Sequence, residues 1–301
     1  MVTDLQVSRS VFDIVSDYRG VLLDAYGVFW GGNAVGMLAG AGDAMKRLVE
    51  SGKSVGILSN STQVAAKEVA KLKGHGLIKG EHYHFLITSG DVVRDVFLKQ
   101  ELPILTPRKT FWAFGGGHPK FSSYNQLFIG TSYNETSDIS EADFIYVSVP
   151  HIGGEDQTDP AAFREEVLRL KSANIPMVCA NPDRFAQEGN PPQIFVRQGS
   201  IAAMFESMGG EVFYVGKPYN KAYRFAMQCF EDRGICDPSN VLMIGDTPET
   251  DIRGARSFGM SSALVTNTGM MAERSIGIGL EKVVSDLAME ECPVFFIESL
   301  S

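Results

Sequence analysis

The stretch VLLDAYGV, residues 21–28, decides the fold because it joins a short apolar run directly to an acidic residue. The same pattern, an apolar run followed at once by a polar residue, recurs at 55–60, 85–89, 212–217, 241–246 and 263–267. Continuous apolar runs are typical of strands buried on both faces, and the helix-like segments between them indicate parallel βαβ units. The sequence therefore predicts an α/β fold with a Rossmann-like parallel sheet.

The residue pattern of the chain changes between residues 101 and 210. Proline and glycine interrupt this part repeatedly, for example at 115–117. It still contains two strand-like runs and a helix-like stretch, at 144–149, 177–180 and 160–172. A chain of 301 residues is long enough for about two domains. We therefore expect a core formed by residues 1–100 and 211–301, with a second α/β unit, residues 101–210, inserted into it.

Composition argues against several kinds of partner. The chain has 27 Lys and Arg against 36 Asp and Glu, a formal charge of -9, which is the wrong sign for a general nucleic-acid-binding surface. No apolar run approaches the roughly 18 residues of a membrane span, and the N-terminus lacks a secretory signal pattern. The four cysteines form no C-x-x-C pair, as is usual for reduced thiols. These features predict a cytoplasmic protein that binds neither nucleic acid nor membranes.

Polar residues that end the apolar runs are the candidates for a functional site. In open parallel sheets, ligands bind beyond the carboxyl ends of the strands, so Asp24, Ser59, Lys217 and Asp246 should converge there. Carboxylates that converge in a buried crevice repel each other unless a cation lies between them. Oxygen ligands favour Mg²⁺, and a lysine supplies a point charge for an anionic substrate.

A helix start predicts where phosphate would bind. Ser59-Asn60-Ser61-Thr62 are four residues suited to an N-cap, ahead of the helix-forming stretch 65–73. The amide groups and dipole at such a start hold phosphate well. Together with the converging carboxylates, this predicts phosphoryl chemistry with Asp24 as the nucleophile.

At this point the sequence resembles a known family. DAYGV (24–28) with Gly32, LSNST (58–62), VGKP (215–218) and IGDTPETDIRGA (244–255) are similar to the four ordered motifs of the haloacid dehalogenase superfamily. The inserted unit and its CANPD segment (179–183) resemble subclass IIA, the NagD-like branch of nucleotide, phosphoglycolate, pyridoxal-phosphate, p-nitrophenyl phosphate and sugar phosphatases. In that branch the insert is an α/β cap that closes over the site.

The resemblance implies a role for each matched residue. Asp24 would attack phosphorus and form an aspartyl-phosphate, and Lys217 would neutralise negative charge. Mg²⁺ would bind Asp24, Asp246 and the backbone carbonyl of Tyr26. Asp251 would support Lys217 or the metal-bound water. The residues that would contact the phosphoryl group or the rest of the substrate are Ser59, Asn60, Ser61, Asn181 and Asp183.

The resemblance also implies a substrate and an assembly. The substrate would be a small phosphorylated metabolite, namely a sugar phosphate or a nucleotide-like monoester, and the protein could pair into a homodimer through its cap.

One position departs from the family pattern. Phosphatases of this type usually carry a second Asp two residues after the nucleophile, where it protonates the leaving alcohol, but this chain has Tyr26 there. A phenol with a pKa near 10 is a poor base at neutral pH, and general acid-base help is worth roughly 10²- to 10⁴-fold. We therefore expect slow turnover of alkyl phosphates.

Tyr26 also supports two alternatives. DAYG resembles the first motif of metal-independent L-2-haloacid dehalogenases, in which an aromatic residue is normal at this place. Asp246, Asp251 and the large insert argue against that reading. The other alternative is a protein that binds a phosphate ester without hydrolysing it. The presence of Asp24 and Lys217 argues against this alternative.

Overall fold

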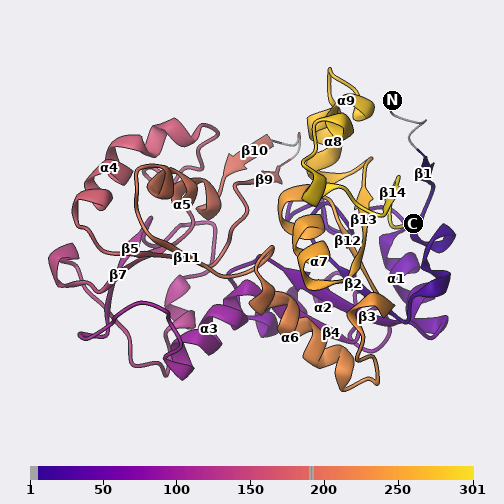
Figure 1. The fold of residues 1–301 in the computed structure, drawn as a ribbon, viewed down its shortest axis with the longest axis horizontal. Coiled ribbons are helices and arrows are strands. Elements are labelled where there is room, and N and C mark those ends of the chain that lie inside the picture. Colours follow the sequence, from indigo (N-terminus) through magenta and orange to yellow (C-terminus); the bar gives the residue numbers. More distant parts are fainter. Residues whose placement is uncertain (1–5, 190, 192) are drawn as a thin grey trace.

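The computed structural model describes residues 6–189, 191 and 193–301, so the first five residues of the predicted core lie outside it. Among the described residues, two parallel sheets form two lobes that lie side by side, and the described ends of the chain belong to the same lobe (Figure 1). The predicted α/β class, with a Rossmann-like core and a cap, is therefore confirmed.

The larger sheet has seven strands in the order β1-β14-β13-β12-β2-β3-β4, and all of its pairs are parallel. Its strands are β1 (Val7–Ser8), β2 (Gly20–Leu23), β3 (Ser54–Ser59), β4 (Phe85–Thr88), β12 (Val241–Gly245), β13 (Ser261–Val265) and β14 (Phe295–Ile297). From β2 the chain proceeds outward in one direction to β4, whereas from β12 it proceeds in the other direction to β14. The boundary between β2 and β12 is thus the place where such sheets bind ligands.

Helices cover both faces of this sheet because its strands are apolar on both sides. Val21 and Leu23 face α1 (Ala41–Glu50) and α2 (Ala65–Gly74). Leu22, with the opposite orientation, packs with α3 (Ser89–Lys99) and α6 (Asn220–Glu231). Alternate side chains of one strand therefore supply two separate hydrophobic layers, as a central parallel strand requires.

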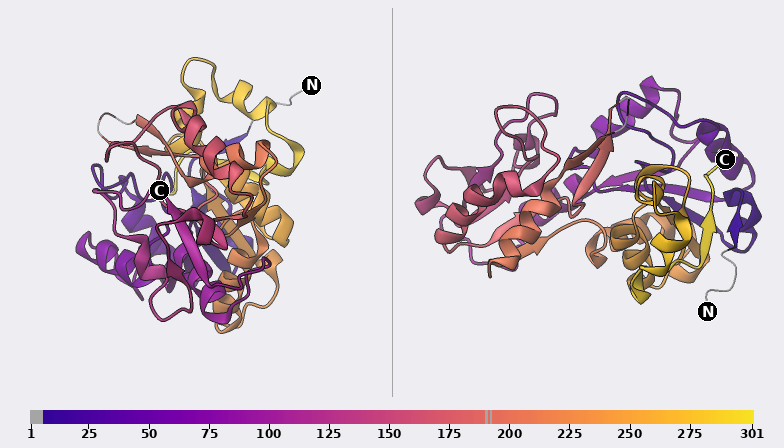
Figure 2. Two further views of the ribbon diagram at one scale, coloured as in Figure 1. Left: turned by 90° about the vertical axis from the view of Figure 1, so that its left-hand side faces the viewer. Right: turned by 90° about the horizontal axis from the view of Figure 1, so that it is seen from above.

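The smaller sheet has five strands in the order β11-β8-β7-β5-β6. They are β5 (Thr110–Phe114), β6 (Asn134–Glu135), β7 (Phe144–Val147), β8 (Met177–Cys179) and β11 (Val212–Tyr214). Two helices, α4 (Arg164–Ser172) and α5 (Gln198–Ser207), pack on it through a separate apolar cluster. An antiparallel hairpin, β9 (Phe185–Glu188) with β10 (Gln193–Val196), extends from this lobe toward the larger one (Figure 2).

One strand lies in a different sheet from the one expected. Residues 212–215 were predicted to belong to the core, but β11 pairs with β8 at the edge of the smaller sheet. The apolar run that ends in a polar residue has the same appearance in either sheet, so its sequence could not reveal its partner. The chain crosses to the larger lobe only after β11, at Gly216-Lys217.

The remaining helices follow β12 and β13 or connect the strands. After β12 come a π-helical turn (Pro248–Ile252) and α7 (Arg253–Phe258), which ends at Gly259 in the left-handed conformation. After β13 come α8 (Gly269–Ser275) and α9 (Leu280–Ser285). Short 3₁₀ turns lie at Val11–Asp13, Val15–Asp17, Tyr124–Leu127, Ile139–Glu141, Pro160–Phe163, Pro238–Asn240 and Met289–Glu291. No helix in the described part of the chain is both long and apolar enough to cross a membrane.

Candidate active site

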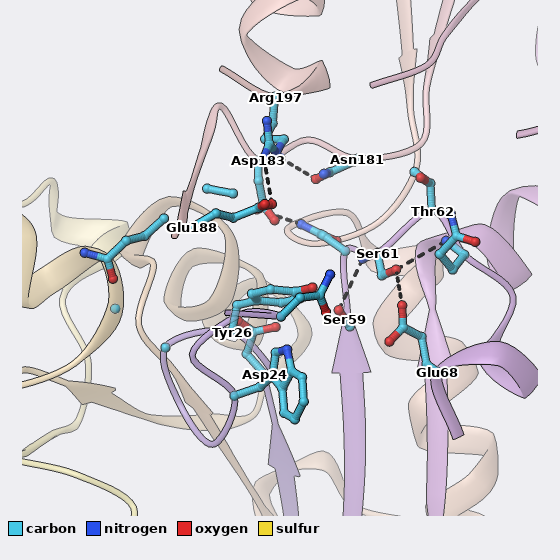
Figure 3. A pocket seen from close by; sticks show the side chains of 18 of the residues that line it. Asp24, Tyr26, Ser59, Ser61, Thr62, Glu68, Asn181, Asp183, Glu188 and Arg197 are labelled. Atoms are coloured by element: carbon cyan, nitrogen blue, oxygen red, sulfur yellow. Dashed lines mark hydrogen bonds and ion pairs between the residues drawn. The ribbon is translucent and has the colours of Figure 1, made fainter. Parts of the chain in front are cut away.

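A cavity of about 350 Å³ lies where the two lobes meet. Its floor contains the residues at the carboxyl ends of three neighbouring strands, with Asp24 after β2, Ser59 at the end of β3 and Asp246 after β12. Its roof comes from the smaller lobe and includes Asp183 and Glu188 (Figure 3). Asp24, Ser59 and Asp246 therefore converge at the carboxyl ends of the central strands, as the sequence predicts.

Lys217 lies between two carboxylates beneath the cavity. Its Nζ is 2.6 Å from Asp24 Oδ1 and 2.7 Å from Asp251 Oδ1. Lys217 is only 1% exposed and Asp251 is fully buried, so water cannot screen these contacts. Asp24 is also fixed through its main chain, whose N–H donates to the Ile244 carbonyl of β12. Asp24 lines the cavity, and Oδ1 is the oxygen that Lys217 binds.

Burial and charge shift the pKa values of this cluster. Burial lowers the pKa of the Lys217 ammonium, but the carboxylates of Asp24 and Asp251 outweigh it and hold that pKa above its ordinary value. Burial raises the pKa of Asp251 to about 6, against the opposing effect of Lys217. Burial, followed by the negative charges of Asp24 and Asp251, raises the pKa of Asp246 well above its ordinary value. The site thus has more negative charge than one ammonium can balance.

A segment that the sequence analysis missed surrounds Asp246. The Met270 amide donates to Asp246 Oδ2 over 2.8 Å, and Thr268 donates to the Gly27 carbonyl. A Cβ on Gly27 would lie 2.0 Å from Asp246 Oδ2, and a Cβ on Gly269 would lie 1.9 Å from it. Two glycines therefore permit the close approach of Asp246 to both loops. The only sequence signal was the polar TNTG run after the strand at 263–265.

The donors present fit a divalent metal ion. Asp24, Asp246 and Asp251 each offer a carboxylate oxygen, and these atoms lie within 4.8 Å of one another. Asp251 already binds Lys217 with one oxygen and the amides of residues 246 and 247 with the other. Asp246 accepts one hydrogen bond on each oxygen, from Thr247 and from Met270, and Asp24 Oδ1 accepts one from Lys217, so both carboxylates keep lone pairs for a cation. Three carboxylates against one ammonium leave a charge of two negative units, which suits a hard divalent cation with oxygen ligands.

The loop after β3 differs in part from the expected phosphate cradle. Helix α2 begins only at Ala65, so residues 59–62 do not cap it. The Ala65 amide donates to the carboxylate of Asp91, so this helix start is already satisfied. Ser59 Oγ accepts the Ser61 amide, and its hydroxyl hydrogen remains available to a ligand. A phosphate at this loop would therefore meet the Ser59 hydroxyl and not the helix terminus, because the Ser61 amide already donates to Ser59 and the Ser61 hydroxyl to Glu68.

The Asn60 side chain is fully engaged within the protein. Its Oδ1 accepts the Lys217 amide at 2.7 Å, and its Nδ2 donates to the Lys217 carbonyl at 3.1 Å and to Asp183 Oδ1 at 2.9 Å. Asn181 is likewise occupied, because it accepts the Asp183 amide and donates to Gln198. Burial raises the pKa of Asp183 to about 6, opposed by Lys217 and by the Asn60 hydrogen bond. Of these predicted contacts, Asp183 alone lines the cavity with an oxygen that is not used in these bonds.

Tyr26 lies between Asp24 and the roof residues (Figure 3). Burial, reinforced by the charges of Glu68 and Glu188, raises the pKa of its phenol above the ordinary value. The Lys71 ammonium lies 5.7 Å from the centre of its ring. The phenol can donate a hydrogen bond but cannot act as a base at neutral pH.

Charged roof and wall residues were also missed by the sequence analysis. Arg197 is 4% exposed and binds Asp156 at 3.0 Å and Glu188 at 2.6 Å. Glu68 of α2 accepts the Ser61 hydroxyl. These residues have no motif, and only their burial in the folded chain reveals them.

Comparisons with known proteins agree with this geometry. A family model described as haloacid dehalogenase-like hydrolase matches residues 21–120, and a model described as HAD-hydrolase-like matches residues 214–289. Chronophin from Bos taurus is 26% identical over 295 residues, covering 96% of this chain and 93% of its own. Glycerol-3-phosphate phosphatase from Gallus gallus is 26% identical over 271 residues, covering 85% and 82%. The crystal structure of a haloacid dehalogenase-like hydrolase from Brucella suis 1330 has a TM-score of 0.79 at 25% identity, covering 98% of this chain and 100% of that one.

Proposed function

Because this chain is a member of the haloacid dehalogenase-like hydrolases of subclass IIA, and is a phosphatase-like hydrolase, we propose that it hydrolyses a small phosphate monoester with the help of Mg²⁺. The observation that carries the proposal is the buried arrangement of Asp24, Lys217 and Asp246 at the edge of the larger sheet. These residues are far apart in the chain and meet only in the fold.

In the proposed reaction, the Asp24 oxygen that does not bind Lys217 attacks phosphorus while the ester P–O bond breaks. The leaving oxygen departs toward the roof and takes a proton from water. A second water then attacks the aspartyl-phosphate, which restores the Asp24 carboxylate and releases inorganic phosphate that carries the protons of that water. Lys217 neutralises charge on Asp24 and on a phosphoryl oxygen, and Asp251 orients its ammonium. Asp24, Asp246 and the Tyr26 carbonyl would hold Mg²⁺, which when bound would withdraw negative charge from the phosphoryl oxygens.

The cavity supports a small polar leaving group. At about 350 Å³ it is at the lower end of the range for ligand sites. Acidic and basic side chains both line it, namely Lys67, Glu68, Lys71, Lys120, Glu188 and Arg197. Such walls suit hydroxyl groups, which both donate and accept hydrogen bonds, and a sugar phosphate or a nucleotide-like monoester therefore fits the proposal. The relative named glycerol-3-phosphate phosphatase also supports a small alcohol as leaving group.

The test is phosphate release from p-nitrophenyl phosphate and from a panel of sugar phosphates and nucleotides, with Mg²⁺ or with a chelator. We expect release that requires Mg²⁺ and is lost in Asp24→Asn. Halide release from 2-haloacids that a chelator does not inhibit would instead establish dehalogenation. Saturable binding of a phosphate ester without turnover, measured by calorimetry, would identify a binding protein.

Two further predictions belong to this proposal. Homodimerisation through the cap is tested by sedimentation of the purified chain. A cytoplasmic location is supported by the four cysteines, none of which forms a disulfide in the described residues, and cell fractionation tests it.

A further inference from the structure

Lys217 lies on the connection between the two lobes. It follows β11, the edge strand of the smaller sheet, and precedes α6, which packs on the larger sheet. Its ammonium nevertheless reaches Asp24 and Asp251 in the larger lobe. A residue on such a connection shifts when one lobe moves relative to the other, unless its main chain is held.

Asn60 holds both polar groups of the Lys217 main chain. The side-chain oxygen accepts the Lys217 N–H at 2.7 Å, and the side-chain nitrogen donates to the Lys217 carbonyl at 3.1 Å. Asn60 is 3% exposed, so these bonds have no competition from water. Gly216 permits this close packing, because a Cβ there would lie 2.6 Å from Asn60 Oδ1.

Asp183 brings the smaller lobe to the same amide. It lies in the loop between β8 and β9, where its own N–H donates to Asn181 Oδ1 at 2.9 Å. Its Oδ1 accepts the second hydrogen of Asn60 Nδ2 at 2.9 Å. The hydrogen bond between Asp183 and Asn60 therefore joins the two lobes, and Asn60 is the residue whose side chain holds the Lys217 main chain.

We propose that Asp183 is a positioning residue, which locks the Asn60 amide and so aligns Lys217 on Asp24 when the smaller lobe is docked. The inference rests on the proposed function and deepens it, because it makes the charge-neutralising lysine dependent on cap closure. A site that is complete only in the closed state commits a bound substrate to reaction and limits wasteful chemistry in the open state.

Two substitutions at Asp183 separate positioning from proton transfer. Asp183→Ala removes the acceptor, and we expect kcat for p-nitrophenyl phosphate to fall about 10- to 100-fold with a smaller change in KM, since a misplaced catalytic group costs that much. Asp183→Asn keeps an acceptor oxygen for Asn60 and should retain kcat within about threefold. Equal loss in both variants would overturn the proposal, because it would show that the carboxyl group itself exchanges a proton.

Gln126→Ala is the matched control. Gln126 of the smaller lobe donates to Gln63 Oε1 of the larger lobe at 2.8 Å, with no link to Lys217. Its loss should leave kcat within about threefold of the wild type. A fall as large as in Asp183→Ala would show that any weakened contact between the lobes suffices, and the proposal would fail.

Amide hydrogen exchange tests the coupling without turnover. In Asp183→Ala and in Asn60→Ala, protection of the peptide around Lys217 should fall about tenfold or more, whereas Asp183→Asn and Gln126→Ala should match the wild type. Unchanged protection in Asp183→Ala would refute the coupling even in an active phosphatase. A wild type that releases no phosphate would refute the proposed function, and the exchange data would still decide the role of Asp183.

Discussion

Tyr26 is the residue on which our expectation of slow turnover rests. It lies between the proposed nucleophile and the roof of the cavity, where an acid would have protonated the leaving oxygen. Its phenol has a raised pKa, because burial and the charges of Glu68 and Glu188 disfavour the phenolate. The phenol therefore stays protonated and can donate only a hydrogen bond.

Tyr26→Asp should speed the hydrolysis of alkyl phosphates, by up to about 10²-fold, because a carboxyl group can protonate an alkoxide and then activate water. Aryl phosphates, whose leaving groups need no proton, should gain much less. The measurement is kcat/KM for an alkyl and an aryl phosphate in both proteins. A folded variant with no gain on the alkyl substrate would show that Tyr26 does not stand in for a missing acid.

Asp246→Asn should stabilise the metal-free protein while it abolishes activity. The pKa of Asp246 is raised in the folded state, so the stabilising protonated form is lost as the pH rises through that raised pKa. Removing the charge should therefore raise the free energy of unfolding by about 1–2 kcal/mol near pH 8, in line with other active-site replacements.

The stability gain of Asp246→Asn over the wild type should vanish near pH 4, where the Asp246 carboxyl of the folded wild type is also protonated. Urea unfolding in a chelator at both pH values measures it. A variant that is less stable than the wild type at the higher pH would contradict the role of charge repulsion in this cluster.

At the scale of single residues, the sequence identified side chains that end strands and little else. Asp24 and Asp246 could be recognised as site residues from the sequence, because each directly follows an apolar run that forms a buried strand. Arg197 and Glu188 could not, because their importance comes from an ion pair between residues near opposite ends of a hairpin. Asn60 was expected to contact phosphate, and the structure shows its side chain engaged by Lys217 and Asp183, which no spacing could have revealed.

At the scale of elements, the loops that follow β2 and β13 close around one carboxylate. Gly27 has a positive φ of 76°, and a Cβ there would meet Asp246 at 2.0 Å. Gly277 has a similar φ of 81°, but a Cβ there would meet nothing within 4 Å. Alanine at either position would strain the backbone, but only alanine at position 27 would also displace Asp246, so a comparison of the two variants distinguishes the two effects.

Gly277→Ala should lose about 1–2 kcal/mol of stability, because it forces alanine into the left-handed region. Gly27→Ala should lose more, because its Cβ must also displace Asp246. Mg²⁺ affinity should fall about 10- to 100-fold only in Gly27→Ala, where Asp246 must move. Calorimetric titration with Mg²⁺ and thermal unfolding of both variants make the comparison. Equal metal affinity in the two would mean that Asp246 does not need its present position.

The elements themselves were predictable where local chemistry decides them. The central strands follow from the apolar runs in the sequence. The helix-forming stretch at 65–73 coincides with α2, but the cap expected at residues 59–62 was wrong, because the Asp91 carboxylate, from α3, accepts the Ala65 amide. The sheet that β11 joins was also misassigned, since strand pairing is a long-range property.

At the scale of the whole molecule, metal binding and stability are linked. The carboxylate cluster is repulsive without a cation, so a bound divalent ion should stabilise the folded chain. At a concentration of about 100 times Kd, Mg²⁺ should add about 2.7 kcal/mol. Thermal unfolding with and without Mg²⁺ measures the shift, and Asp246→Asn provides the control in which it should be absent. An equal shift in that variant would place the metal elsewhere.

The insertion of the smaller lobe also has a consequence for synthesis on the ribosome. Strand β2, which carries Asp24 at its end, pairs on one side with β3 but on the other with β12, which the ribosome makes only after the whole inserted lobe. An emerging chain therefore exposes one unpaired edge of its apolar central strand until β12 has been made, a state in which aggregation competes with folding. Chaperone demand during translation should accordingly peak before residues 241–245 leave the exit tunnel.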